Sequence, residues 1–307
     1  AYGIYFVIQR RRRLTIAVMP LGNYQRLLQI ESVNWVLLPE PRLPDLQGCD
    51  AVVADFTADL PPAWESFLAD AALEGTIVYQ MKPLEESLSG RVRIDHLSEN
   101  SFGSLVPARG YFYLKALIDW LVAVAALPVL GPVMLGAALA IKAGDGGPVL
   151  FKQSRVGHRG RPFTVYKFRT MVTGVPGEPD ARRAAMTGDA DPRITRVGAI
   201  LRRTRIDELP QILNILKGQM SWIGPRPEAA ILSDWYVGEI PFYRYRHVVK
   251  PGISGWAQVS QGHVAEVDQV HEKLQYDFYY VKYFSPWLDL LILFKTLRTM
   301  MNGFGAR

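Results

Sequence analysis

Short apolar runs alternate with amphipathic stretches over residues 13–100. Runs rich in β-branched and other apolar residues predict strands at 13–19, 34–40, 49–56 and 75–81. Between them, segments 23–30 and 61–75 have helical spacing, and the second starts with prolines and ends in glycine. This alternation predicts a small α/β domain with a parallel, Rossmann-like sheet over residues 13–108.

The turn after the first predicted strand is Pro-Leu-Gly-Asn, residues 20–23. A dinucleotide-binding turn needs several glycines, because the backbone must approach the pyrophosphate closely. We therefore expect a structural, regulatory or dimerisation role for this domain, and on that ground a homodimer.

A long apolar run follows within residues 113–142. From Trp120 to Ile141 there are 22 residues without a charge, and a helix of that length is about 33 Å long, enough to cross a bilayer. Pro128 and Pro132 remove backbone hydrogen bonds from its middle. Basic residues flank both ends, so two paths remain open: a transmembrane helix, or a re-entrant helix–break–helix hairpin that breaks at Gly131 and Pro132.

The two ends of the chain are also apolar in part. Residues 1–12 place an apolar run before a cluster of arginines, the reverse order of a secretory signal. This basic N-terminal segment fits the end of a membrane helix or a short strand. Residues 285–301 are too short and too charged to span a bilayer, and we expect a packed or interfacial helix there.

Charge separates the two halves of the chain. Residues 1–142 carry 12 Lys and Arg against 14 Asp and Glu, whereas residues 143–307 carry 23 against 15, a net charge of +8. The second half is therefore expected to bind anions such as nucleotides or anionic lipid. Cys49 is the only cysteine, which excludes a disulfide framework and a cysteine metal cluster and favours a reducing compartment.

Two further apolar runs, 148–153 and 163–171, predict a β-hairpin whose turn contains Gly157 and Gly160. Guanidinium groups match phosphate oxygens in a forked geometry, so a basic hairpin face suits a diphosphate. Nucleic-acid backbone is the alternative ligand, but the hairpin shows no nucleic-acid-binding signature and we expect no such partner. The basic side chains expected to gather on one side are Lys152, Arg155, Lys167 and Arg169.

An acidic pair, Asp207 and Glu208, lies between arginines and a Gly-Pro-Arg-Pro segment at 224–227. Acids and a proline are common in the first turn of a helix, so the pair has a purely structural interpretation. Among so many cations it also fits phosphoryl transfer. One acid would attack phosphorus, and the other would hold Mg²⁺ or move a proton.

Four segments in fixed order resemble the bacterial sugar transferases, the monotopic polyprenyl-phosphate phosphoglycosyl transferases. They are KFRTM, the run DPRITRVGAILRRTRIDELPQILNILKGQMSWIGPRPE, KPGISGWAQV and KLQYDFYYVKYFSPWLDLLILFKTL. The resemblance covers residues 112–300. Larger members carry a Rossmann-like module before the hairpin, usually preceded by four transmembrane helices. None is visible here, so the chain resembles a truncated or shorter member.

The resemblance implies a mixed α+β, membrane-associated catalytic domain over residues 143–307, with Mg²⁺ as cofactor. It makes Asp207 the nucleophile on the β-phosphate of a UDP-sugar and assigns Glu208, with Asp207, to metal binding or proton handling. Arg202 and Arg226 match phosphate-binding arginines, and Lys167 and Arg169 line the same pocket. Family hairpins often break at Ser-Pro, whereas this chain has Gly131-Pro132.

The implied reaction transfers a sugar 1-phosphate to undecaprenyl phosphate, with UMP released. This would be the first membrane step of exopolysaccharide, capsule or O-antigen synthesis, on the cytoplasmic face of the bacterial inner membrane. A non-catalytic membrane scaffold of polysaccharide assembly is the alternative, but a scaffold has no need of both acids together with Arg202 and Arg226.

Overall fold

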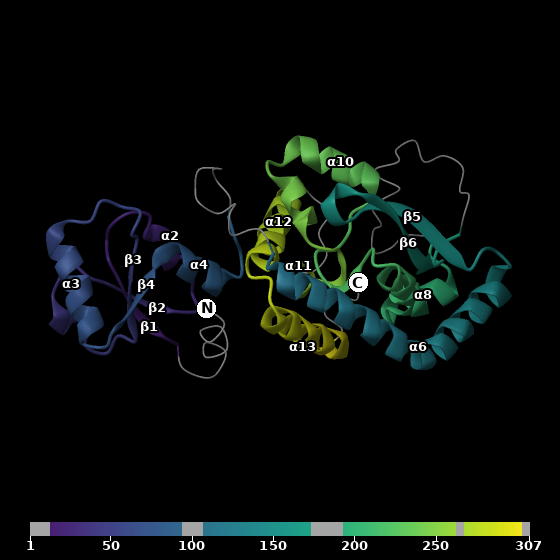
Figure 1. Cartoon of the computed structure of the whole chain (residues 1–307), viewed down its shortest axis with the longest axis horizontal. Helices are drawn as coiled ribbons and strands as arrows, with labels where there is room; N and C mark the ends of the chain where they lie inside the picture. The colour runs from purple at the N-terminus through teal and green to yellow at the C-terminus, as the bar shows by residue number, and fades with distance from the viewer. Residues whose placement is uncertain (1–12, 94–106, 173–192, 262–266, 303–307) are drawn as a thin grey trace. The chain divides into compact units, whose positions relative to one another are not determined.

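A computed structural model describes residues 13–93, 107–172, 193–261 and 267–302. The chain divides into two compact units, Ala1–Val92 and Arg93–Arg307 (Figure 1). The basic segment predicted at 1–12 lies outside the described residues.

The first unit contains a four-stranded parallel sheet in the order β2-β1-β3-β4, which confirms the predicted parallel arrangement. Its role and the expected homodimer stay predictions. The strands are β1 (Thr15–Val18), β2 (Asn34–Leu37), β3 (Ala51–Ala54) and β4 (Ile77–Gln80). The helical segments are α2 (Gln25–Leu28), η1 (Leu43–Leu46), α3 (Pro62–Leu73) and α4 (Met81–Ser89).

Both faces of this sheet are covered, because the side chains of each strand alternate between two cores. Ala17 and Val52 face a core that includes Trp64 and Phe67 of α3. On the other face, alternate residues of the same strands pack with Leu27 of α2 and with Met81 and Leu84 of α4.

At the carboxyl end of this sheet, Asp55 joins the loops after β1 and β3. Its Oδ2 accepts a hydrogen bond from the Asn23 amide at 3.2 Å, and its Oδ1 accepts one from the Thr57 amide at 3.1 Å. Gly22 has φ +70°, and a Cβ there would lie 2.3 Å from Asp55 Oδ2. The Asp55 carboxylate thus lies between two loops at the edge of the sheet where parallel sheets commonly bind ligands.

The first helix described in the second unit is α6 (Arg109–Asp145), one continuous helix that includes Pro128 and Pro132. The helix is not interrupted at Gly131-Pro132 but bends near its middle (Figure 1), as expected where prolines remove backbone hydrogen bonds. The re-entrant path through the membrane stays a prediction.

One face of α6 packs on the rest of the unit. Ala123 and Leu127 contact a core with Ile212 and Ile215, and the next core pairs Ala137 and Ile141 with Phe168 and Leu201. Among the described residues, α6 is the one helix long and apolar enough to cross a membrane; its most apolar window has a mean hydropathy of 2.2 and is 11% buried. Most of its apolar surface therefore has no protein cover.

The predicted β-hairpin is present as β5 (Leu150–Val156) and β6 (Pro162–Phe168), paired antiparallel through the turn η2 (His158–Gly160). In its register Lys167 pairs with Phe151 and Arg155 with Phe163, whereas Lys152 pairs with Tyr166. Because side chains alternate along a strand, Lys152 lies on the opposite face from Arg155 and Lys167. The prediction that all four basic residues share one side is wrong for Lys152.

The segment that carries the acidic pair is α8 (Arg196–Arg203), the 3-10 turn η3 (Ile206–Gln211) and α9 (Ile212–Leu216). The acidic pair thus lies in a tight turn that is followed by a short helix, and not in the first turn of an α-helix. Arg205 has φ +59°, which ends α8 and redirects the chain, and Pro210 cannot donate to an α-helical ladder.

Asn214 of α9 is fully buried and closes the free edge of β6. Its Oδ1 accepts a hydrogen bond from the Tyr166 amide at 3.2 Å, and its Nδ2 donates to the Thr164 carbonyl at 2.7 Å. The side-chain amide thereby takes the place of a third strand next to Lys167.

A two-stranded parallel pair is formed by β7 (Ser221–Ile223) and β8 (Gly252–Ser254), and the C-terminal helix packs against both strands. The C-terminal α13 buries Leu288 and Ile292 and exposes Trp287 and Phe294. The helix predicted at 285–301 therefore packs on the core and also presents an apolar face. The helical segments are α10 (Ala230–Glu239), η4 (Tyr243–Val248), α11 (Trp256–Ser260), α12 (Val267–Lys282) and α13 (Pro286–Asn302).

We expect Gly198→Ala to destabilise the protein by about 1–3 kcal/mol, a typical cost of overpacking. A Cβ at Gly198 would lie 2.1 Å from the Thr170 carbonyl oxygen, so the junction between β6 and α8 would have to move. Thermal and denaturant unfolding in detergent would measure the change.

The matched control is Gly238→Ala in α10, where a Cβ meets nothing within 4 Å. It should leave stability unchanged or raise it by about 0.5–1 kcal/mol. Equal effects of the two substitutions would contradict the close approach at Gly198.

Candidate active site

The acidic pair lies in the turn η3, where Asp207 and Glu208 are 9% and 7% exposed. The turn packs against β6 and α8 and brings the pair to the hairpin face that carries Lys167. Two neighbouring carboxylates are thus removed from bulk water, which penalises their charged forms unless cations compensate.

Glu208 has two cationic partners from distant segments. Its Oε1 lies 2.9 Å from Lys167 Nζ and 2.8 Å from Arg226 Nη2, and both donate hydrogen bonds to it. Burial acts to raise the pKa of Glu208, but the charges of Arg226 and Lys167 hold that pKa well below its usual value. Burial lowers the pKa of Lys167 to about 8 despite the attraction of Glu208. Glu208 is therefore a fixed anion.

Asp207 is the opposite case. Its Oδ1 is buried and has no hydrogen-bond partner among the described residues. Burial, and then the negative charge of Glu208, raise the pKa of Asp207 above its usual value. A buried carboxylate oxygen without a partner is a more reactive base and nucleophile than one held by two cations.

The structure also allows a test of the expected Mg²⁺ site. In the described part of the chain, no three side chains among His, Cys, Asp and Glu converge as a metal cage. Mg²⁺ is usually held by one or two carboxylates together with substrate phosphates, and the free oxygen of Asp207 suits such a site. Glu208 already shares one oxygen between two cations, so Asp207 is the better ligand of the two.

The other predicted phosphate-binding residues lie at different distances from the pair. Arg155 donates to the Pro227 carbonyl and to Gln153 Oε1. Arg202 Nε donates to Thr170 Oγ1 at 3.1 Å, and Arg169 lies against Gly147. Lys167 and Arg226 thus contact Glu208 directly. Arg155 contacts the loop that carries Arg226, at the next residue, and Arg202 and Arg169 contact neighbouring segments.

A second ionic cluster, which the sequence analysis missed, lies beside the first. Lys273 of α12 forms an ion pair with Glu228. Arg246 Nη2 lies 2.8 Å from Asp277 Oδ2, and both side chains are buried. A sequence pattern could have predicted this cluster. Lys273 and Asp277 are four residues apart, on one face of a helix whose other core positions are aromatic or apolar.

The profile of the bacterial sugar transferase family matches residues 110–303. The chain belongs to this family. The matched region contains α6, the hairpin, the acidic pair and both ionic clusters, and leaves the first unit outside it.

Named relatives differ in how much of the chain they match. A protein of Aeromonas hydrophila named UDP-N-acetylgalactosamine-undecaprenyl-phosphate N-acetylgalactosaminephosphotransferase is 50% identical over 305 residues, 99% of this chain and 71% of that protein. The UDP-glucose:undecaprenyl-phosphate glucose-1-phosphate transferase of Xanthomonas campestris pv. campestris is 44% identical over 61% of this chain and 38% of its own. The Escherichia coli K12 protein of the same name is 40% identical over 60% of this chain and 39% of that protein.

We expect Glu208→Gln to lower the stability of this family member at pH 7 by about 3–5 kcal/mol, because Lys167 and Arg226 would remain buried without a countercharge. A carboxylate whose folded-state pKa is depressed stabilises the protein fully above its unfolded pKa, near 4.5, and loses that contribution as the pH falls through the folded value. The difference in thermal midpoint should therefore be constant from about pH 5 to 7 and shrink below about pH 4.5.

Glu239→Gln, at an exposed position near the end of α10, is the matched control and should change the midpoint little at any pH. A constant difference for Glu208→Gln down to pH 3 would argue against the ionic role of Glu208.

Proposed function

We propose that this protein transfers a sugar 1-phosphate from a UDP-sugar to undecaprenyl phosphate through a covalent intermediate on Asp207. The observation that carries the proposal is the unpartnered Oδ1 of Asp207 beside a carboxylate that holds Lys167 and Arg226. A reactive carboxylate and two fixed cations are what displacement at a diphosphate requires.

In the first step, Asp207 Oδ1 attacks the β-phosphorus of the UDP-sugar. A bond forms between this oxygen and phosphorus, and the bond from phosphorus to the bridging oxygen breaks, so that UMP leaves with the electron pair. In the second step, an oxygen of the lipid phosphate attacks the same phosphorus. Asp207 leaves as a carboxylate, and the product is a polyprenyl-diphospho-sugar.

Lys167 and Arg226 stabilise the negative charge on the diphosphate and on departing UMP. Glu208 keeps both cations in place before substrate arrives and prevents their mutual repulsion. Attack requires ionised Asp207, so the rate should fall as the pH falls through its raised pKa.

Mg²⁺, when bound, neutralises further phosphate charge and makes UMP a better leaving group. Asp207 is the ligand we propose for it, with Glu208 as a second carboxylate close by in sequence.

UDP-N-acetylgalactosamine is the donor we propose first. The Aeromonas protein whose name includes this sugar matches 99% of the chain, whereas the two proteins named for UDP-glucose match about three fifths of it. Transfer of this sugar phosphate to undecaprenyl phosphate would place the first sugar of a glycan on the lipid.

We further propose that α6 enters and leaves the inner membrane from the cytoplasmic side. Near its start, Lys115 forms a buried ion pair with Asp289 of α13 at 2.8 Å, and the Asp119 carbonyl accepts from Trp222 Nε1 at 3.1 Å. Near its end, Ile141 packs with Leu201 of α8. Both ends are therefore held by one compact unit, which favours the re-entrant path over a crossing.

Incubation with Mg²⁺ and a panel of UDP-sugars, without lipid acceptor, should increase the mass of the intact protein by one phosphosugar. The adduct should disappear when undecaprenyl phosphate is added, because the lipid phosphate displaces Asp207. Asp207→Asn should form no adduct, and Glu239→Gln should behave like the native protein. No adduct, UMP or lipid product from a folded native protein with any donor would favour the scaffold alternative.

Impermeant maleimide should label cysteines at both ends of α6 from the same side of the membrane. The background is Cys49→Ser, which removes the only cysteine, and the matched probes are Ala108→Cys and Ala143→Cys, both at exposed positions. Val129→Cys, at a position that is 70% exposed in the middle part of the helix, should react only after detergent is added. Labelling of the two end positions from opposite sides would mean that α6 crosses the bilayer.

A further inference from the structure

The loop that carries Arg226 is held through its carbonyl groups. Four consecutive carbonyls each accept a hydrogen bond from a different residue, and two of the donors are adjacent in β5: Pro225 from the Gly252 amide at 3.0 Å, Arg226 from Arg246 Nη2 at 2.8 Å, Pro227 from Arg155 Nη1, and Glu228 from the Val156 amide at 3.2 Å. Pro225 and Pro227 have no amide hydrogen. The loop therefore depends on donors that reach it from outside.

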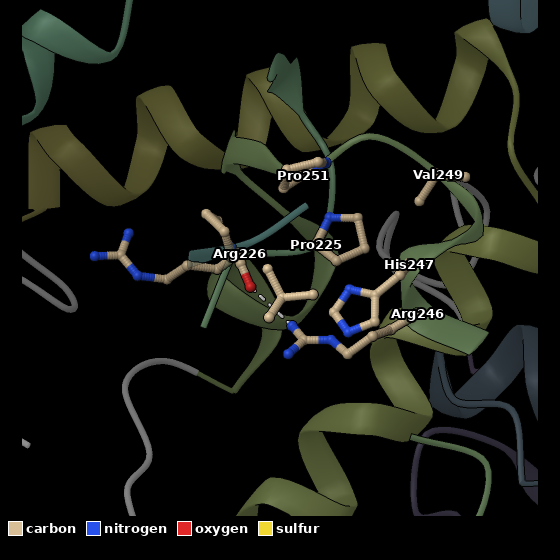
Figure 2. Close-up of a pocket in the computed structure, with 8 residues that line it drawn as sticks. Pro225, Arg226, Arg246, His247, Val249 and Pro251 are labelled. Atoms are coloured by element: carbon tan, nitrogen blue, oxygen red, sulfur yellow. Dashed lines mark hydrogen bonds between the residues drawn. The ribbon is translucent and has the colours of Figure 1, made fainter. Parts of the chain in front are cut away.

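One side of this loop faces η4. Pro225, Arg226 and Pro227 of the loop line a small cavity there together with Arg246 and His247 of η4. Figure 2 shows the Arg226 carbonyl directed toward the Arg246 guanidinium, while the Arg226 side chain extends away from it. The hydrogen bond from Arg246 thus restrains the side of the loop that borders this cavity.

Arg246 and Arg155, the two arginines that donate to the loop, are themselves held by other residues. Arg246 is 3% exposed, pairs with Asp277 at 2.8 Å and donates to the Tyr243 hydroxyl at 2.7 Å. Arg155 directs Nε and Nη2 to Gln153 Oε1 at 3.0 and 2.7 Å, which leaves Nη1 aimed at the Pro227 carbonyl. Their donors are therefore already engaged with protein atoms on the side that faces the loop.

We propose that Arg155 and Arg246 are positioning residues that clamp the Pro225–Glu228 loop and thereby place Arg226 against Glu208, rather than ligands of the substrate phosphates. This inference rests on the function proposed above and assigns Arg155 a different role from the phosphate contact expected from the sequence. Arg226 binds the diphosphate, and the two other arginines act through it.

The test is a pair of double-mutant cycles with UDP as the probe, measured by titration calorimetry in detergent. Arg246→Lys and Arg155→Lys each keep the charge but lose the planar fork that reaches a carbonyl and its second partner together. In the native background each should weaken UDP binding by about ten-fold, as expected for one lost charge-assisted hydrogen bond. In an Arg226→Ala background each should change binding by less than about two-fold.

A direct phosphate contact predicts a different result. The weakening caused by Arg155→Lys or Arg246→Lys would then be the same with and without Arg226, because independent contacts contribute independently. That outcome would overturn the proposal. Arg161→Lys, at an exposed position on the same hairpin, is the matched control and should leave binding unchanged.

Hydrogen exchange gives a second readout that needs no activity. The amides of Gly252 and Val156 donate to the clamped carbonyls, so peptides that contain them should exchange faster in Arg246→Lys and Arg155→Lys and at the native rate in Arg161→Lys. Unchanged exchange in both clamp variants would also overturn the proposal. If native protein binds no UDP, the proposed function fails, and exchange still decides whether the clamp exists.

Milder variants cover the case in which a lysine variant does not fold. Tyr243→Phe removes one acceptor of Arg246, and Gln153→Ala removes the anchor of Arg155. Each should show the same non-additivity with Arg226→Ala, with a smaller change in UDP binding. Full additivity in these variants would count against the clamp in the same way.

Discussion

The structure of the site depends on one buried carboxylate shared by two cations. Glu208 lies on a turn, Lys167 on a strand and Arg226 on a loop, and none of these three charges could be buried alone at an acceptable cost. The attraction of both cations to the one carboxylate holds three segments of the second unit together. It also leaves Asp207, the adjacent residue, without a partner for its Oδ1. Of the two adjacent acids, Glu208 is thus held by two cations, whereas Asp207 keeps a buried oxygen without a hydrogen-bond partner.

The apolar helix α6 has two different surroundings to satisfy. Its exposed face needs an apolar environment, whereas Lys115 and the Asp119 carbonyl tie its first turns to the polar interior of the catalytic unit. The core around Ile212 and Ile215 presses the middle of α6 against α9, directly after the turn with the acidic pair. A membrane-facing surface and the site are thus separated by one short helix.

Regular patterns were predictable from the sequence, and contacts between distant segments were not. Buried β-branched runs identified the four parallel strands, and the spacing around Gly157 and Gly160 identified the hairpin. The same alternation could have placed Lys152 on the other face. The continuous path of α6 through Pro128 and Pro132 was not predictable, because neighbouring packing can support a helix that proline weakens. The roles of Arg155 and Arg246 depend on carbonyl acceptors about 70 and 20 residues away, which leave no local pattern.

Two prolines flank Arg226 in a loop whose carbonyls are all occupied. Proline fixes φ in the unfolded chain as well as in the folded one, so little backbone freedom remains at this position in either state. The conformational entropy that an arginine loop would ordinarily lose on meeting an anion has mostly been lost before the anion arrives. An anion that bound Arg226 would gain the Coulombic attraction with a small ordering penalty, so its affinity would come from rigidity of the backbone and not from additional contacts.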